Sequence, residues 1–185
     1  MKKLLTLLTL MLMLPMVTFA QVQEKKPQTT FEKFTSSLGT MMKFVDYDLP
    51  DIKSKYAVAN SSIRKVITKN ETECFLNISF TNARNEEYSA YIAYNDVIEL
   101  KKALDELKKQ VVNDGTGDAN YLENTFTTKD NLKMGYYIEK KKSTDKAPTW
   151  VLNLEGFGSS SLIFDDSSAL STLFDNAIQK LNAVK

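Results

Sequence analysis

Histidine is absent from the 185 residues of this sequence, and cysteine occurs only once, as Cys74. Because histidine is the commonest general base and the commonest metal ligand in proteins, its absence excludes a Ser-His-Asp triad. One cysteine without histidine also excludes zinc sites with the usual ligands within one chain. No intramolecular disulfide can form, so the fold must be stabilised by packing. An enzyme with this composition would have to rely on carboxylates, lysine, tyrosine or serine, so we expect no cofactor and assign no catalytic residue.

Long hydrophobic runs are also missing, except at the start of the chain. Two lysines precede the apolar run Leu4 to Leu14, and Pro15 ends it before the small residues that close at Ala20. This order is typical of a secretory signal peptide, so we expect residues 1–20 to be one, cleaved after Ala20. The run is shorter than the roughly 20 residues of a membrane-spanning helix. The sequence therefore predicts an exported protein, periplasmic or secreted, with no transmembrane segment in its mature chain.

The residues after the predicted cleavage site indicate how the exported chain is organised. Gln21 stands where a lipoprotein carries cysteine, so we expect a soluble protein without a lipid anchor. Residues 21–30 are polar and contain Pro27, which predicts a flexible leader. Residues 31–185 suffice for a single α+β domain with one core. The formal net charge is +1, so nucleic acid is not expected as a partner, and an envelope or extracellular partner is expected only as a class.

The first half of this domain predicts a β-meander that leads into a helix. In the middle strand, apolar residues alternate with polar ones, which turns Cys74 toward the core. Phe31 to Phe44 is too irregular for an assignment, and Tyr47 to Asp51 predicts a turn around Pro50. The predicted strands are Met41 to Tyr47 at an edge, Ile63 to Thr68, Glu73 to Phe80 and Glu87 to Tyr94. A helical period then follows, with Val97, Leu100, Leu104, Leu107 and Val111 on one face.

Helix boundaries and a second meander complete the predicted architecture. Asp96 and Glu99 form a capping-box pattern, and Gly115 predicts the end of that helix. The second set of strands is Thr125 to Thr128, Leu132 to Lys140, Thr149 to Glu155 and Ser160 to Phe164, with loops at Asp130-Asn131 and Lys140 to Pro148, and a helix from Ser167 to Val184. The sequence thus predicts an α+β fold of antiparallel meanders, each followed by one helix, with the helices packed on one face of the sheet.

The two halves also align at an offset of seventy residues. Tyr94-Asn95-Asp96 then falls on Phe164-Asp165-Asp166, and Leu100 falls on Leu170. This pattern suggests an internal duplication, although any strand that enters a capped helix gives a similar pattern.

Two groups of residues are candidates for binding. Asp46, Asp48 and Asp51 form an oxygen-rich segment that suits calcium, although their spacing matches no defined calcium loop and a solvated turn also explains them. Aromatic side chains on the strands could stack on a sugar, a peptide or single-stranded nucleic acid, and strand propensity explains them as well. The candidate ligand or partner surface consists of Tyr91, Tyr136, Tyr137 and Trp150.

The overall character of the chain resembles two groups of known proteins. Its Lys-Lys-Leu-Leu start, its Lys, Asn and Thr-rich remainder, and its meandering strands with two helices resemble small uncharacterised exported proteins of Bacteroidetes-type bacteria. In topology alone, Tyr56 to Leu181 also resembles the repeat of PUR and Whirly single-stranded nucleic-acid binders. That second resemblance implies nucleic-acid binding, which the predicted export and the near-neutral charge argue against.

Three functional hypotheses follow from these observations. The leading one is an exported, non-catalytic binding or interaction domain of the cell envelope that binds its partner through the sheet. The main alternative is a carrier that holds an apolar small molecule between the sheet and the helices. A third hypothesis, a secreted carboxylate-dependent hydrolase, needs two acids that converge in a cleft, and no spacing in the sequence indicates such a pair.

Overall fold

The structure is a computed structural model that describes residues 27–36, 39–139, 147–155 and 159–185. These residues form helices α2 to α4 and strands β1 to β8, so the class is α+β, as predicted. The predicted signal peptide lies outside the described residues, as do most of the predicted leader and most of the Lys140 to Pro148 loop. Among the described helices, none has the length and hydrophobicity needed to cross a membrane.

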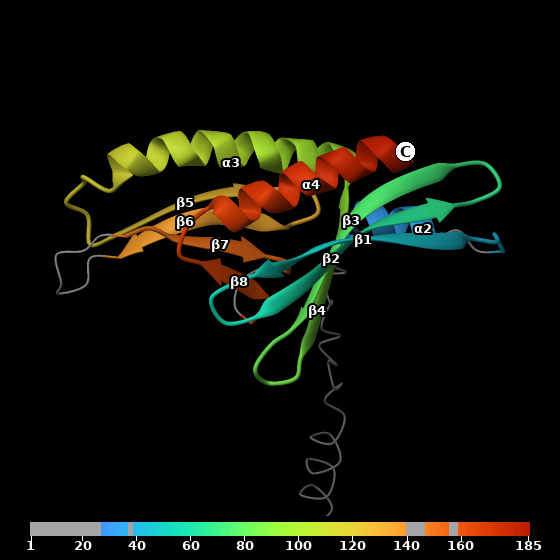
Figure 1. Cartoon of the computed structure of the whole chain (residues 1–185), viewed down its shortest axis with the longest axis horizontal. Coiled ribbons are helices and arrows are strands. Elements are labelled where there is room, and N and C mark those ends of the chain that lie inside the picture. The colour runs from blue at the N-terminus through green and yellow to red at the C-terminus, as the bar shows by residue number, and fades with distance from the viewer. Residues whose placement is uncertain (1–26, 37–38, 140–146, 156–158) are drawn as a thin grey trace, which may run out of the picture.

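Each half of the chain forms its own four-stranded antiparallel sheet (Figure 1). Sheet A consists of β1 (Lys43–Lys53), β2 (Val58–Ile67), β3 (Thr72–Thr81) and β4 (Glu87–Ala93), in that spatial order. Sheet B consists of β5 (Tyr121–Thr127), β6 (Lys133–Glu139), β7 (Thr149–Asn153) and β8 (Ser161–Phe164). Because strands that follow one another in the sequence also pair in space, both sheets are the predicted meanders.

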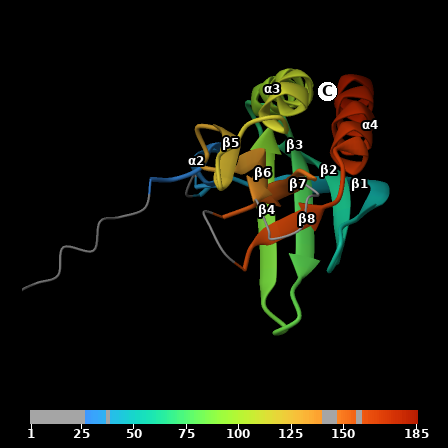
Figure 2. The same ribbon diagram turned by 90° about the vertical axis from the view of Figure 1, so that its left-hand side faces the viewer.

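Two long helices follow the two sheets. Helix α3 (Tyr94–Asp114) continues from β4, and α4 (Ser168–Val184) comes after β8. The helices pack side by side (Figures 1 and 2), and the predicted packing of the helices on one face of the sheet stays a prediction. Helix α3 contacts strands of both sheets, whereas α4 packs on β1, β2 and β3, which the other half of the chain forms. Because α3 contacts both sheets and α4 packs on the sheet of the other half, the two sheets share one core.

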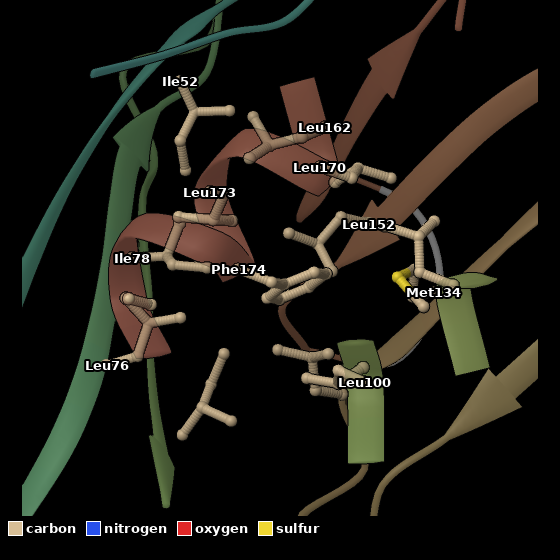
Figure 3. Packing of buried hydrophobic residues seen from close by; sticks show 14 of the residues in the cluster. Ile52, Leu76, Ile78, Leu100, Met134, Leu152, Leu162, Leu170, Leu173 and Phe174 are labelled. Carbon is tan, nitrogen blue, oxygen red and sulfur yellow. The ribbon is translucent and has the colours of Figure 1, made fainter. Parts of the chain in front are cut away.

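The core lies where the two helices meet the sheets (Figure 3). Leu100 and Leu104 of α3 are fully buried, and so are Leu170 and Phe174 of α4. The offset of seventy residues therefore aligns core positions of the two helices. Strand side chains fill the remaining space, including Ile63, Leu76, Ile78, Met134, Leu152 and Leu162.

The start of α3 differs from the prediction. The helix begins at Tyr94, and its N-cap residue Ala93 makes no side-chain cap hydrogen bond. Asp96 therefore lies inside the first turn, where it is only 2% exposed. The predicted capping box of Asp96 and Glu99 is wrong, because the Asp96 side chain turns into the protein. Gly115 ends the helix, as predicted.

The turn predicted at Tyr47 to Asp51 is also wrong, because β1 runs through it without ending. A change of register between Leu49 and Ile52 interrupts the pairing of β1 with β2 around Pro50. Ser61 Oγ on β2 donates a hydrogen bond to the Pro50 carbonyl oxygen at 2.9 Å. Since β1 is an edge strand with one unpaired side, it can accept a proline that a central strand would reject.

Helix α2 (Thr30–Thr35) begins at the last residue of the predicted leader and continues into the segment for which the sequence pattern gave no assignment. In β3, Cys74, Leu76 and Ile78 are buried toward the core, as the alternation predicts. Phe75 points to the opposite face of sheet A, yet it is only 1% exposed because α2 packs against it. A short helix therefore covers part of the face that lies away from α3 and α4.

Candidate functional site

Helix α2 is fixed to the domain at its N-terminus by side-chain hydrogen bonds. Thr29 and Glu32 form a capping box, in which each side chain accepts a hydrogen bond from the backbone N–H of the other residue. The backbone N–H and the hydroxyl of Thr30 donate to the Asp130 carboxylate at 2.9 and 3.1 Å. Asp130 lies in the turn between β5 and β6, so these bonds connect α2 to the second half of the chain.

Aromatic contacts fix the face of α2 that packs on sheet A. The ring of Phe31 stacks on Tyr91 with 3.9 Å between ring centroids and meets Phe75 edge to face at 5.1 Å. Phe34 also meets the edge of Phe75, at 6.0 Å. Such pairs contribute about 1 kcal/mol each beyond the area that they bury. The Phe75 ring is therefore the part of sheet A against which both phenylalanines of α2 pack.

Arg64 on β2 extends this aromatic cluster toward the edge of the sheet. Its guanidinium donates two hydrogen bonds to the Asp46 carboxylate, at 2.8 and 2.7 Å, and one to the Tyr91 hydroxyl at 2.7 Å. These bonds from Arg64 hold the pKa of Asp46 below its usual range, against the opposing effect of burial. Asp46 is therefore the acceptor of a structural ion pair, which leaves it poorly placed to bind calcium with Asp48 and Asp51. Within the described residues, no three acidic or cysteine side chains gather as metal ligands do.

A cleft of about 550 Å³ lies between α2, β3 and the start of α3. We call it the α2 cleft, and it is lined by Lys33 and Phe34 of α2, the segment Thr72 to Phe75 of β3, the segment Ala93 to Asn95, and two lysines from distant parts of the chain. A volume of this size is typical of sites for small organic ligands.

Three lysines and three aromatic rings define the chemistry of the α2 cleft. The lysines are Lys33, Lys129 and Lys185, and the rings belong to Phe34, Phe75 and Tyr94. The Lys185 ammonium group lies 4.2 Å from the centroid of the Tyr94 ring, which is a cation–π contact. Glu73 supplies the acidic side chain among the described lining residues, so cationic groups outnumber anionic ones.

Cys74 lies at the floor of the α2 cleft, with 4% of its surface exposed. Burial raises the pKa of the Cys74 thiol, which leaves it protonated and a poor nucleophile. The thiol therefore acts as a small apolar group in the wall of the cleft.

Asp96 lies behind Lys129, one of the three lysines of the cleft. Its Oδ1 atom is 3.6 Å from Lys129 Nζ, and its buried Oδ2 atom has no hydrogen-bond partner. Burial, the largest cause, raises the pKa of the Asp96 carboxyl, and the Lys129 ammonium group opposes that effect. The Asp96 carboxylate therefore positions Lys129 at the cleft and offsets part of its charge.

The four aromatic residues predicted to share a binding surface lie in different places. Tyr136 and Trp150 are 1% and 2% exposed and pack against each other in the core, with 5.1 Å between ring centroids. Tyr136 and Trp150 are directly opposite each other on β6 and β7, so their side chains lie on the same face of sheet B, and both point into the core. Both rings are therefore covered by other side chains. Tyr91 lies under α2, whereas Tyr137 is on the outer face of sheet B.

The outer face of sheet B has a hollow of its own, of about 210 Å³, which we call the sheet B hollow. Tyr121 and Tyr137 stand at one side of it, and Gly135 lies in its floor. A hydrogen bond from the Tyr121 hydroxyl to Glu123 raises the pKa of Tyr121 to about 12, so the phenol stays neutral. This hollow has less than half the volume of the α2 cleft and fewer charged groups.

No protein-family model and no curated protein sequence matches this chain. The chemistry of the site must therefore be judged from its geometry. The α2 cleft combines cationic side chains with aromatic walls, which suits a ligand that is anionic at one end and apolar at the other.

Sequence reasoning did not find the α2 cleft, because its lysines come from α2, the turn between β5 and β6, and the C-terminal helix. One signal was present in the sequence. Thr29 followed three residues later by Glu32 is the pattern of a capping box, and the aromatic pair Phe31 and Phe34 follows Thr29. That pattern predicts a helix that begins at Thr30, the last residue of the predicted leader.

Proposed function

We propose that this protein is an exported, non-catalytic binding domain that takes up a small organic anion with an aromatic or apolar part in the α2 cleft. The observation that supports this proposal is the meeting of Lys33, Lys129 and Lys185 with three aromatic rings around one cleft. A carboxylate end of the ligand would lie among the lysines, and its apolar part would lie against Phe34 and Phe75.

The charges around the cleft favour an anion over a neutral or cationic ligand. The ion pairs among the described residues do not include Lys33 or Lys185, and Lys185 has the Tyr94 ring as its neighbour. Hydrogen bonds between an ammonium group and a carboxylate are stronger than those between neutral groups. Because the cleft is open to solvent, salt would weaken the attraction.

The predicted signal peptide supports a location outside the cytoplasm. A periplasmic or secreted domain without a lipid anchor would meet its ligand free in solution or presented by an envelope partner. This location is part of the proposal and rests on residues 1–20 of the sequence.

The α2 cleft at the surface is a better candidate for the ligand site than a cavity between the sheets and the helices. The alternative of an apolar carrier needs empty space in that layer, where the structure has tightly packed side chains such as Leu76, Leu100 and Phe174 (Figure 3). Removing such contacts to admit a ligand would cost several kcal/mol, since protein interiors are packed as densely as organic crystals.

Isothermal titration calorimetry with phenylpropionate tests the proposed function. We expect binding of phenylpropionate and at least tenfold weaker binding of the neutral phenylpropionamide, because only the first can pair with the lysines. The double variant Lys33→Gln and Lys185→Gln should weaken phenylpropionate binding about tenfold, which is about 1.4 kcal/mol.

Lys102→Gln is the matched control, because Lys102 is exposed on α3 and does not line the cleft. It should leave the affinity within twofold of the original. Equal binding of the acid and the amide, or equal losses in the control and the double variant, would contradict the proposal.

A further inference from the structure

Strand β3 continues past the point where its neighbour β4 ends. The pairing of β3 with β4 stops at Phe75, which lies opposite Ala93, because the chain then turns into α3 at Tyr94. On its other side β3 stays paired with β2 as far as Thr72, which lies opposite Ile67. The segment Thr72 to Cys74 therefore has a partner strand on one side only.

This open stretch of strand edge lies in the α2 cleft. Thr72 to Phe75 line the cleft without interruption, and Ala93 to Asn95 line it at the point where β4 turns away. Lys33 and Phe34 of α2 border the edge on one face of the sheet, and Lys185 after α4 borders it on the other. A ligand in the cleft therefore meets main-chain groups of β3 as well as the lysines and the aromatic rings.

We propose that the natural ligand of the α2 cleft is the carboxyl-terminal end of an extended peptide, which adds to β3 as a short antiparallel or parallel strand. This inference rests on the proposed binding of an organic anion in the same cleft. The peptide main chain would hydrogen-bond to the edge at Thr72 to Cys74, its terminal carboxylate would lie among the lysines, and its last side chain would pack on Phe34 and Phe75.

The dimensions of the cleft suit a short peptide. Three residues of an open strand edge extend over about 10 Å, which matches two or three residues of an added strand. The cleft volume of about 550 Å³ lies within the range of small-ligand sites. A simple aromatic acid would use the lysines and the rings but would leave the strand edge without a partner.

Strand β1, one of the two edge strands of sheet A, is protected against the same kind of pairing. Strand β1 contains Pro50 and a change of register between Leu49 and Ile52, which interrupt a regular edge. The segment Thr72 to Cys74 contains no proline and no change of register, and Thr72 and Glu73 in it are exposed. The end of β3 therefore offers a more regular edge to an added strand than β1 does.

Fluorescence anisotropy competition with the tripeptide Ala-Val-Phe, free at its carboxyl end, tests this inference. We expect the tripeptide to bind at least tenfold more tightly than phenylpropionate, because it adds main-chain hydrogen bonds. A carboxyl-amidated tripeptide should lose at least tenfold in affinity. An analogue with ester bonds in place of the internal amide bonds should lose a similar factor, because it lacks the N–H donors.

Hydrogen exchange measured on the same complexes provides a second readout. The amide groups within Thr72 to Cys74 should exchange more slowly with the tripeptide bound, whereas phenylpropionate, which gives these groups no hydrogen-bond partner, should leave their exchange rates unchanged. The double variant Lys33→Gln and Lys185→Gln should weaken tripeptide binding about tenfold, whereas Lys102→Gln should not.

The outcomes separate the two proposals. If phenylpropionate binds but the tripeptide binds no more tightly, or if the ester analogue equals the tripeptide, the peptide inference is overturned and the anion site remains. If neither phenylpropionate nor the tripeptide binds, both proposals fall.

Discussion

The outer faces of the two sheets differ, although each sheet is a four-stranded meander followed by a helix. On sheet A, α2 covers Phe75 and Tyr91, and the α2 cleft lies beside it. On sheet B, Tyr137 and Tyr121 remain at the surface around a smaller hollow. The difference shows that the candidate site comes from α2, which lies outside the plan that the two halves share. Four predictions test this comparison.

The first prediction concerns what the two halves have in common. Leu100→Ala in α3 and Leu170→Ala in α4 remove fully buried side chains from corresponding positions of the helices. Each should lower the free energy of unfolding by about 3 kcal/mol, because a large apolar side chain is lost and a cavity remains. Chemical denaturation measures both. A loss below about 1 kcal/mol at one position would show that α3 and α4 do not contribute equally to the stability of the core.

The second prediction concerns the floor of the sheet B hollow. A Cβ atom at Gly135 would lie 2.1 Å from the Asn124 carbonyl oxygen on the neighbouring strand, so β5 would have to move. Gly135→Ala should therefore cost about 2 kcal/mol of stability. In Gly115→Ala the nearest atom lies at 3.5 Å, and the change should stay within about 0.5 kcal/mol. Thermal unfolding of both variants checks this, and equal effects would contradict it.

The third prediction separates the covered face from the open one. Phe31→Ala removes the stacked contact with Tyr91 and the edge contact with Phe75, and it should cost about 1.5 kcal/mol and weaken ligand binding in the α2 cleft. Tyr137→Ala on the outer face of sheet B should cost less than about 0.8 kcal/mol and leave that binding unchanged. Denaturation and calorimetry on the two variants measure these effects. If Tyr137→Ala weakened binding more than Phe31→Ala, the sheet B hollow would be the better candidate site.

The fourth prediction uses two aspartates whose pKa values shift in opposite directions. Arg64 lowers the pKa of Asp46 below the ordinary 3.8, so the ion pair stabilises the fold above that pH and the stabilisation is lost as the pH falls through the lowered pKa. Asp46→Asn should cost about 1 kcal/mol at neutral pH and much less in strong acid.

Asp96 behaves in the opposite way, because burial raises its pKa. Below pH 3.8 the carboxyl is protonated in both states, and its cost to stability grows as the pH rises through the raised pKa. Asp96→Asn should therefore be more stable than the original protein at neutral pH, and the two should converge in acid. Unfolding measured between about pH 2 and pH 7 tests both variants, and a pH dependence of the same sign for both would contradict the assignment.

Much of the fold could be predicted because periodicity determines it. The spacing of Leu100, Leu104 and Leu107 indicates α3, and the alternation around Cys74 and Leu76 indicates β3 with its core face. Local signals failed where tertiary contacts override them. Pro50 is tolerated because β1 is an edge, and Asp96 is buried because the helix begins earlier than its cap-like pattern indicates.

The candidate site was harder to predict from the sequence for a different reason. Lys33, Lys129 and Lys185 are far apart in the chain, and neither their type nor their spacing indicates that they meet. The aromatic residues were predicted as one surface from their number, although alternation sends Tyr136 and Tyr137 to opposite faces of sheet B. Only the pairing of strands and the position of α2 decide which ring is accessible.

A nuclear magnetic resonance titration of the isotope-labelled protein with phenylpropionate tests the central claim most directly, because it locates binding on one outer face or the other. The account predicts shifts of the backbone amides of Lys33, Lys185 and the segment Thr72 to Phe75, with Tyr121 and Tyr137 unchanged. Shifts that centre on Tyr121 and Tyr137, or no shifts at a saturating concentration, would contradict it.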